Sequence, residues 1–85
     1  MKKNLFKWAK NPQLYIYTLN RYSGGYGEYR AFVIVASSEK TARRIACENA
    51  AEEGNSAWVS AEIEKIGMYT GNKGEHLVLG DFIAG

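Results

Sequence analysis

Two apolar runs joined by a glycine-rich segment constrain the fold of this chain more than any other feature. Residues 14–19 and 31–36 consist mainly of β-branched and aromatic side chains, which favour strands. Three glycines lie in the segment between them, and glycine reaches backbone angles that other residues adopt only at a cost in free energy. The pattern predicts a β-hairpin whose strands cover about residues 14–22 and 30–36.

One amphipathic helix is predicted after the hairpin. Ser37-Ser38-Glu39 offers a serine N-cap and an acidic residue for the first turn, where a negative charge complements the helix dipole. Gly54 predicts that the helix ends near Glu53. The residues at the spacing of one helix face, which we expect to pack on the sheet, are Ala42, Ile45, Ala46, Asn49 and Ala50.

Two further strands are expected in the carboxyl half, over about residues 61–69 and 76–79. Ile63 and Ile66 are three residues apart, which departs from strand alternation and predicts a bulge. A turn signal of the Asn/Gly type at residues 71–74 separates the two strands. The preceding segment is a connection in which Trp58 is expected to fill the edge of the core.

Together these elements predict a single α+β domain over residues 13–85 in the order β-β-α-β-β. A four-stranded, mainly antiparallel sheet would carry one helix on one face. The strand order stays open, and two antiparallel hairpins joined by a right-handed helical crossover are the preferred layout. The expected core consists of Leu14, Ile16, Phe32, Ile34, Ile45, Ala46, Ile63, Leu77 and Leu79.

Residues 1–12 predict a basic, aromatic N-terminal arm or short helix. Leu5, Trp8 and Ala9 have the spacing of one helix face, and Pro12 ends it. The arm either packs over one end of the sheet or contacts a partner. It lacks the apolar core of about 7 residues that a secretion signal needs, and no run approaches the roughly 18 residues that span a bilayer. We therefore expect a cytoplasmic protein without a membrane partner.

The charges are unevenly distributed along the chain. Residues 1–50 hold nine Lys or Arg against three Glu (+6), and residues 51–85 hold two Lys against six acids (−4). Such a division creates a basic face and an acidic face, or is lost when the two halves interleave on folding. Two basic groups are candidate contact residues, one in the hairpin loop and one in the first half of the helix, where an anion is also favoured. They are Arg21, Tyr22, Tyr26, Tyr29 and Arg30, and Lys40, Arg43 and Arg44.

Residues that carry catalysis or hold metals are sparse. Cys47 and His76 are the only cysteine and the only histidine, so the chain can form no internal disulfide and no cysteine-based metal site of its own. Glu62, Glu64, Glu75 and Asp81 are not predicted to converge in a cleft. We expect a protein that is not an enzyme and that uses no cofactor or metal.

Tyrosines interleaved with arginines are also typical of surfaces that stack on nucleic-acid bases. Tyr15 and Tyr17 of the first strand would extend the tyrosine–arginine loop into such a platform. The pI of 8.7 is below the value of about 9 expected of a dedicated nucleic-acid binder. Binding of single-stranded nucleic acid is therefore the alternative hypothesis.

The carboxyl half carries the short motifs Trp58-Val59-Ser60, Ile63, Ile66-Gly67 and the terminal Gly80-Asp81-Phe82-Ile83-Ala84-Gly85. With these motifs the chain resembles, over roughly residues 14–85, a family of small phage and prophage proteins. Members of that family open with a Tyr-Ile-Tyr-like strand and have Asn where this chain has Ile83, and the arm over residues 1–12 is not part of the pattern. The resemblance implies phage origin, and small accessory phage proteins often bind and block a host factor.

The leading hypothesis is therefore a small, non-enzymatic, phage-encoded binding protein that blocks a host factor in the host cytoplasm. An inhibitor of host defence, such as an anti-CRISPR protein, is one form of this function. The expected partner is a host protein or a protein–nucleic acid complex, and nucleic acid alone under the alternative hypothesis. A sheet edge can also pair with a second copy of the chain to give a homodimer.

Overall fold

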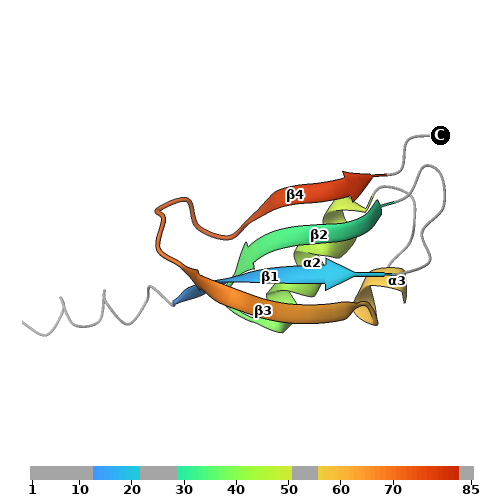
Figure 1. Ribbon diagram of the computed structural model, residues 1–85, viewed down its shortest axis with the longest axis horizontal. Helices are drawn as coiled ribbons and strands as arrows, with labels where there is room; N and C mark the ends of the chain where they lie inside the picture. The colour runs from blue at the N-terminus through green and yellow to red at the C-terminus, as the bar shows by residue number, and fades with distance from the viewer. Residues whose placement is uncertain (1–12, 22–28, 51–55, 83–85) are drawn as a thin grey trace, which may run out of the picture.

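The computed structural model describes residues 13–21, 29–50 and 56–82, which form one antiparallel sheet and two helices (Figure 1). The arm over residues 1–12 and the loop over residues 22–28 lie outside the described residues. The described elements, in chain order, are β1 (Leu14–Asn20), β2 (Tyr29–Ala36), α2 (Glu39–Asn49), α3 (Ser56–Val59), β3 (Glu62–Tyr69) and β4 (His76–Phe82). The mixed α+β fold is thus confirmed, with the short helix α3 added to the predicted elements.

The four strands lie in the order β3-β1-β2-β4, and all three neighbouring pairs are antiparallel. The predicted pairing of β1 with β2 is confirmed. The layout of two hairpins is wrong, because β3 and β4 lie at opposite edges. Strands β1 and β2 carry apolar side chains on both faces and occupy the centre, whereas β3 carries Glu62, Glu64 and Lys65, and charged side chains protect an edge.

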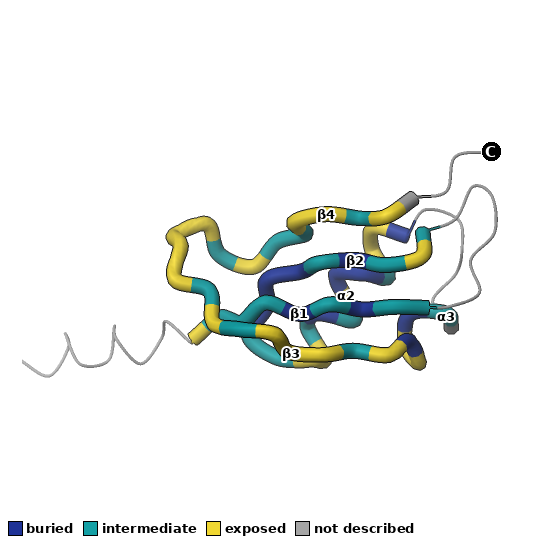
Figure 2. The backbone as a smooth tube through the Cα atoms, in the orientation of Figure 1, coloured by how far each residue is buried: buried dark blue, intermediate teal, exposed yellow. Residues whose placement is uncertain are grey.

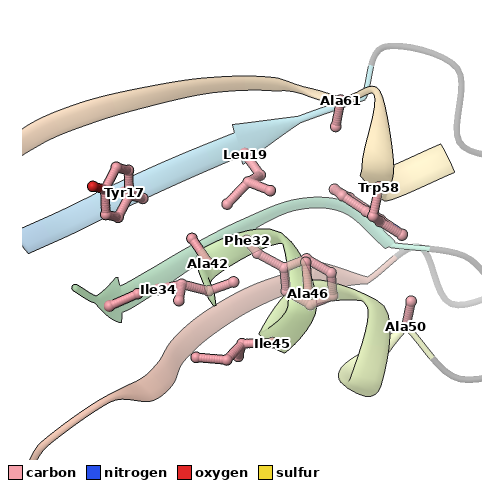
Figure 3. Packing of buried hydrophobic residues seen from close by; sticks show 11 residues of the cluster. Tyr17, Leu19, Phe32, Ile34, Ala42, Ile45, Ala46, Ala50, Trp58 and Ala61 are labelled. Carbon is pink, nitrogen blue, oxygen red and sulfur yellow. The ribbon is translucent and has the colours of Figure 1, made fainter. Parts of the chain in front are cut away.

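Both helices pack on the same face of the sheet (Figure 1). Leu19, Phe32 and Ile34 point from the sheet toward α2, where Ala42 and Ala46 are fully buried against them (Figure 3). Alanine has a short side chain, so α2 can lie close to the strands. Burial is concentrated in β2 and α2, while β3 and β4 are mostly exposed or half-buried (Figure 2).

The core face of β1 is not the predicted one. Tyr17 and Leu19 are buried with the helix, so Leu14 and Ile16 belong to the opposite face. Alternation alone could not choose between them, because both faces of β1 are apolar. The choice follows from the pairing of Leu19 with Phe32, since cross-strand partners project to the same face.

Leu79 was predicted in the core and is instead 63% exposed. The pairing of β2 with β4 shifts between Val33 and Ile34, so that Leu77 is opposite Ile34 and Leu79 is opposite Val33. Leu77 therefore packs against the core, and Leu79 lies on the other face. A bulge inserts one extra residue, so the residues beyond it project to the opposite face of the sheet from the one that simple alternation predicts.

The bulge predicted in β3 is confirmed. Ile16 pairs with Gly67 and Tyr17 pairs with Lys65, which leaves Ile66 as the extra residue. Ile63, which precedes the bulge, packs against the core.

Helix α2 begins as predicted and ends earlier. The Oγ of Ser38 accepts a hydrogen bond from the backbone N–H of Thr41 at 3.2 Å, so Ser38 is the N-cap. The last helical residue is Asn49, not a residue near Glu53. The Asn49 amide donates to the Ile45 carbonyl at 2.8 Å, which satisfies this polar residue at the margin of the buried face.

Helix α3 places Trp58 at the end of the core, as expected for this side chain. Trp58 is fully buried, and its ring lies 4.7 Å from that of Phe32. No helix in the described part of the chain is long and apolar enough to cross a membrane.

Candidate functional site

The face of the sheet turned away from the helices has no described helix over it (Figure 1). Its members follow from the strand register, because partners across an antiparallel pair share a face. The row Glu64–Thr18–Val33–Leu79 crosses all four strands, and so does the row Glu62–Asn20–Ala31–Asp81. We call these eight residues the open patch.

The other end of this face is closed by its own side chains. The rings of Tyr69 and His76, from strands at opposite edges, are 5.5 Å apart in an edge-to-face contact. The connection of residues 70–75 joins the same two strands at this end (Figure 1). Val35, which pairs with His76, is only 1% exposed. The open patch is therefore the part of the face that remains accessible to a partner.

The open patch combines apolar and acidic side chains. Leu79 is 63% exposed, and Val33 beside it is half-buried although no described helix covers it. Glu62 and Glu64 are exposed at the β3 edge. Polar residues are expected on the solvated face of an antiparallel sheet, whereas an exposed leucine beside a valine is unusual there.

Two shallow hollows flank Asn20 in the open patch. One, of about 310 Å³, lies beside β3 and is lined by Asn20, Glu62, Ile63 and Glu64. The other, of about 230 Å³, lies beside β4 and is lined by Asn20, Arg21, Arg30, Ala31 and Asp81. The patch thus has an acidic hollow at one edge and a mixed-charge hollow at the other.

The contact residues predicted at the base of the hairpin loop take part in packing. The Tyr29 ring lies 4.7 Å from the Phe32 ring, and the Arg21 guanidinium lies 5.5 Å from the centre of the Trp58 ring. Together with the contact between Phe32 and Trp58, this makes a continuous row of four side chains at the end of the core. Tyr22 and Tyr26, predicted in the same group, lie outside the described residues.

Arg30 is the member of this group that reaches the open patch. Its guanidinium donates to the Asp81 carboxylate at 2.7 Å, and both side chains are about half exposed, at 55% and 50%. An ion pair this exposed contributes little to stability. The carboxylates at the other edge of the patch are Glu62 and Glu64.

The three basic residues predicted on α2 have different surroundings. Lys40 is exposed, and Arg44 is paired with Glu48 at 2.8 Å along the helix. The Arg43 guanidinium donates to the carbonyls of Ala61 at 2.7 Å and Trp58 at 3.2 Å, and so holds the end of α3. Arg43 therefore contacts the same residue, Trp58, whose ring Arg21 approaches, and the binding role of both predicted groups stays a prediction.

A carboxylate of the chain itself lies just before the start of α2. The Glu75 carboxylate accepts hydrogen bonds from the backbone N–H and the hydroxyl of Ser37, both at 2.8 Å. These two bonds, and more weakly the charge of Arg44, hold the pKa of Glu75 below its ordinary value of 4.5. Glu75 borders an open cleft of about 780 Å³ between residues 70–75 and the start of β1.

The stacking platform expected on β1 does not form on the open face. Tyr15 and Tyr17 lie on the helix side, and Tyr17 is only 3% exposed. Burial, followed by the charge of Glu39, raises the pKa of the Tyr17 phenol. None of the eight residues of the open patch is aromatic.

Cys47 and His76 lie on opposite sides of the sheet. Cys47 packs beside the core on α2, and burial raises the pKa of its thiol. His76 pairs with Val35 on the face without helices, and its Nδ1 is 2.7 Å from the Gly74 carbonyl oxygen, to which it donates. Within the described ranges, no three His, Cys, Asp or Glu side chains are grouped closely enough to hold a metal ion.

No protein-family model, curated protein or solved structure matches this chain. The resemblance to small phage proteins therefore stays a prediction.

Little in the sequence indicates the open patch. Leu79, one of its members, was predicted in the core, because the face that each residue of β1 and β4 occupies depends on register and on a bulge. One signal was present, since Glu62 and Glu64 are two residues apart and so share a face of β3. The apolar side chains beside them could not be assigned without the strand order.

Proposed function

We propose that the chain is a binding protein that acts, without catalysis, by occupying the surface of another protein. The observation that supports this proposal is the open patch, where Leu79 and Val33 lie on a sheet face that no described helix covers. Clustered exposed apolar side chains rimmed by polar ones mark protein contact surfaces.

The edges of the sheet add to this surface. Ile66 on β3 is 55% exposed and Val78 on β4 is 53% exposed, whereas Met68, which is 60% exposed, lies on the helix side with its partner Tyr15. Burial of such side chains against a partner removes apolar area from water, at roughly 25 cal/mol per Å². A partner that covers the open patch and one edge would therefore gain a substantial apolar contribution.

The resemblance to small phage proteins supplies the class of partner in this proposal. The partner is a protein of the bacterial host whose activity is blocked when its surface is covered. An inhibitor of host defence, such as an anti-CRISPR protein, is the form that we put to the test.

The test begins with the full-length chain as bait in host cells, followed by titration of each purified captured protein. We expect a saturable 1:1 complex and loss of the captured protein's own activity. Leu79→Ser should weaken binding by about tenfold or more, because it removes an apolar contact that contributes roughly 1.5–3 kcal/mol when fully buried. Glu48→Ser, on the exposed side of α2, is the matched control and should leave the affinity unchanged.

Two results would contradict the proposal. One is a chain that binds no host protein at all. The other is a chain that binds generic single-stranded oligonucleotides with an affinity that falls steeply with salt, which is the behaviour of a nucleic-acid binder.

A further inference from the structure

The acidic and basic side chains of the described residues are unevenly divided between the two faces of the sheet, although Arg30 reaches the open patch and Glu39 and Glu48 lie on α2. Glu62, Glu64 and Asp81 belong to the open patch. The basic residues Lys40, Arg43 and Arg44 belong to α2, on the other side (Figure 1). The division of charge seen along the sequence is therefore partly retained in space.

Lys65 shows how the segregation arises within β3. It pairs with Tyr17, and its ammonium group lies 4.0 Å from the centre of the Tyr15 ring, so it projects to the helix side. Its neighbour Glu64 projects to the open patch. Arg30 is the basic side chain that reaches the patch from β2, and it is already paired with Asp81.

The acidic hollow beside β3 is large enough for one basic side chain. Its volume of about 310 Å³ is roughly ten times the ~30 Å³ that a water molecule occupies in the liquid. Glu62 and Glu64 line it together with Asn20. Two carboxylates and an amide oxygen are acceptors suited to an ammonium or a guanidinium group.

The apolar part of the open patch begins in the next row. Thr18 and Val33 are the central pair of the row that starts at Glu64 and ends at Leu79. A partner residue seated on Val33 and Leu79 would therefore lie two strands away from a cation in the acidic hollow, or roughly 10 Å at the usual strand spacing. Side chains three or four residues apart on a partner segment span such a distance.

We propose that the open patch binds a protein segment in which Lys or Arg flanks a large apolar side chain. The cation would occupy the hollow between Glu62 and Glu64, and the apolar side chain would cover Val33 and Leu79. This inference rests on the proposed function and names the chemistry of the partner. The charges set specificity and the rate of association, while the apolar contact supplies most of the affinity.

The test uses a random library of peptides of about twelve residues, displayed by ribosomes and selected on the immobilised full-length chain. Enriched peptides are expected to carry a higher net positive charge than the unselected library, with at least one large apolar residue near a Lys or Arg. Affinities of the best peptides should fall severalfold when the ionic strength rises from about 0.1 M to about 1 M, because the Debye length shortens from about 10 Å to about 3 Å.

Variants of the full chain locate the contact. The double variant Glu62→Lys, Glu64→Lys should weaken peptide binding by about tenfold or more, and Glu62→Gln, Glu64→Gln by less. The milder pair keeps the test valid if the double reversal disturbs folding. The matched control, Glu39→Lys with Glu48→Lys on α2, makes the same change of charge and should leave the affinity within about twofold of the original, since these residues lie on the other side of the sheet.

Three outcomes would overturn the inference. The enriched peptides could be neutral or acidic, or their binding could be lost in the α2 control and kept in the Glu62, Glu64 variants. Alternatively, changing the four lysines of residues 1–12 to glutamine could strengthen peptide binding, which would identify the chain's own arm as the occupant of the patch. Each of these leaves the proposed function standing if a host protein is still bound, whereas a chain that binds neither peptides nor host proteins refutes both.

Discussion

Gly80 is a residue at which a single added carbon is expected to disturb the packing of the core. It lies opposite Phe32 in the β2–β4 pair. A Cβ at this position would be 2.7 Å from the Cε1 of Tyr29 and 2.9 Å from the Cε1 of Phe32, closer than carbon atoms approach in proteins. Both rings belong to the aromatic row that closes the core, so they cannot move independently.

We therefore predict that Gly80→Ala lowers the free energy of unfolding by about 1–3 kcal/mol, the usual cost of overpacking. Gly67→Ala is the matched control, because a Cβ there meets nothing within 4 Å. It should leave stability unchanged or raise it by about 0.5–1 kcal/mol, since alanine restricts the unfolded chain. Chemical denaturation of both variants measures the difference, and equal stabilities would contradict the packing described at Gly80.

Glu75 makes part of the stability dependent on pH. Its pKa is lowered in the folded state by the two hydrogen bonds from Ser37. A group of this kind stabilises the fold fully above its unfolded pKa, near 4.5, and the contribution is lost as the pH falls through the lower folded pKa.

We predict that Glu75→Gln reduces the free energy of unfolding at neutral pH by roughly 1 kcal/mol, the value for hydrogen bonds to a charged group discounted for exposure. The difference from the original chain should shrink below pH 4.5. Denaturation curves at several pH values measure it. In Ser37→Ala, NMR titration of the Glu75 carboxyl should show its pKa closer to the ordinary value. A difference independent of pH would show that the hydrogen bonds do not act in solution.

At the scale of elements, Arg43 joins the two helices. It leaves α2 at the middle of the helix and donates to the carbonyls of Trp58 and Ala61, one at the end of α3 and one just before β3. The Trp58 carbonyl belongs to a helix of four residues, which cannot satisfy all of its own terminal groups.

Arg43→Met should therefore lower the free energy of unfolding by about 1–3 kcal/mol, because two carbonyls lose a charged donor while the aliphatic packing is largely kept. Arg44→Met, one residue along, removes only the exposed pair with Glu48 and should cost about 0.3–0.5 kcal/mol. Thermal unfolding followed by circular dichroism compares the two. A larger loss for Arg44 than for Arg43 would contradict this assignment.

Elements were predictable from the sequence wherever local chemistry decides them. A serine N-cap, the start of α2 and an irregularity between Ile63 and Ile66 each depend on a few adjacent residues, and the structure has them at Ser38, Glu39 and Ile66. The end of α2 and the existence of α3 were not predicted, because Gly54 is a typical stop signal whereas the helix ends at Asn49.

The sequence could not predict which face of the sheet each strand residue occupies, nor the order of the strands. Both depend on contacts between residues that are distant in the chain. Tyr17 carries a polar hydroxyl and Ile16 does not, yet Tyr17 is the buried one. Its burial is decided by pairing with β2, whose helix-side residues are fixed by Phe32 and Ile34. The residues of the candidate site could not be predicted for the same reason, since a different register would have moved Thr18 and Val33 into the core.

For the whole molecule, the strand order makes the connection from β3 to β4 a span across the sheet. Three strand spacings separate the two edges, or about 14 Å. The chain from the Cα of Tyr69 to the Cα of His76 can span at most about 25 Å. It can span about 18 Å if two residues are removed. The connection must also pass around the ends of β1 and β2, so a connection shortened by two residues would have to be almost fully extended.

Deletion of Asn72 and Lys73 should therefore destabilise the fold by more than about 1 kcal/mol, whereas insertion of Gly-Ser at the same place should cost less than about 0.6 kcal/mol. Denaturation of both variants tests this. In a sheet of two hairpins the shortened connection would be an ordinary hairpin loop and the deletion would be tolerated. Tolerance of the deletion would thus exclude the order β3-β1-β2-β4.

The alternation of β1 and β2 between two faces has a consequence for how such a protein diversifies. Residues such as Leu19 and Phe32 pack in the core and stabilise the fold, while their immediate neighbours Thr18 and Val33 project to the open patch on the other face of the sheet. Under the proposed function, affinity and folding are therefore encoded at alternate positions of the same two strands. A lineage of such binding proteins could then change its target by replacing every second residue, and the fold that presents the new surface would be left intact.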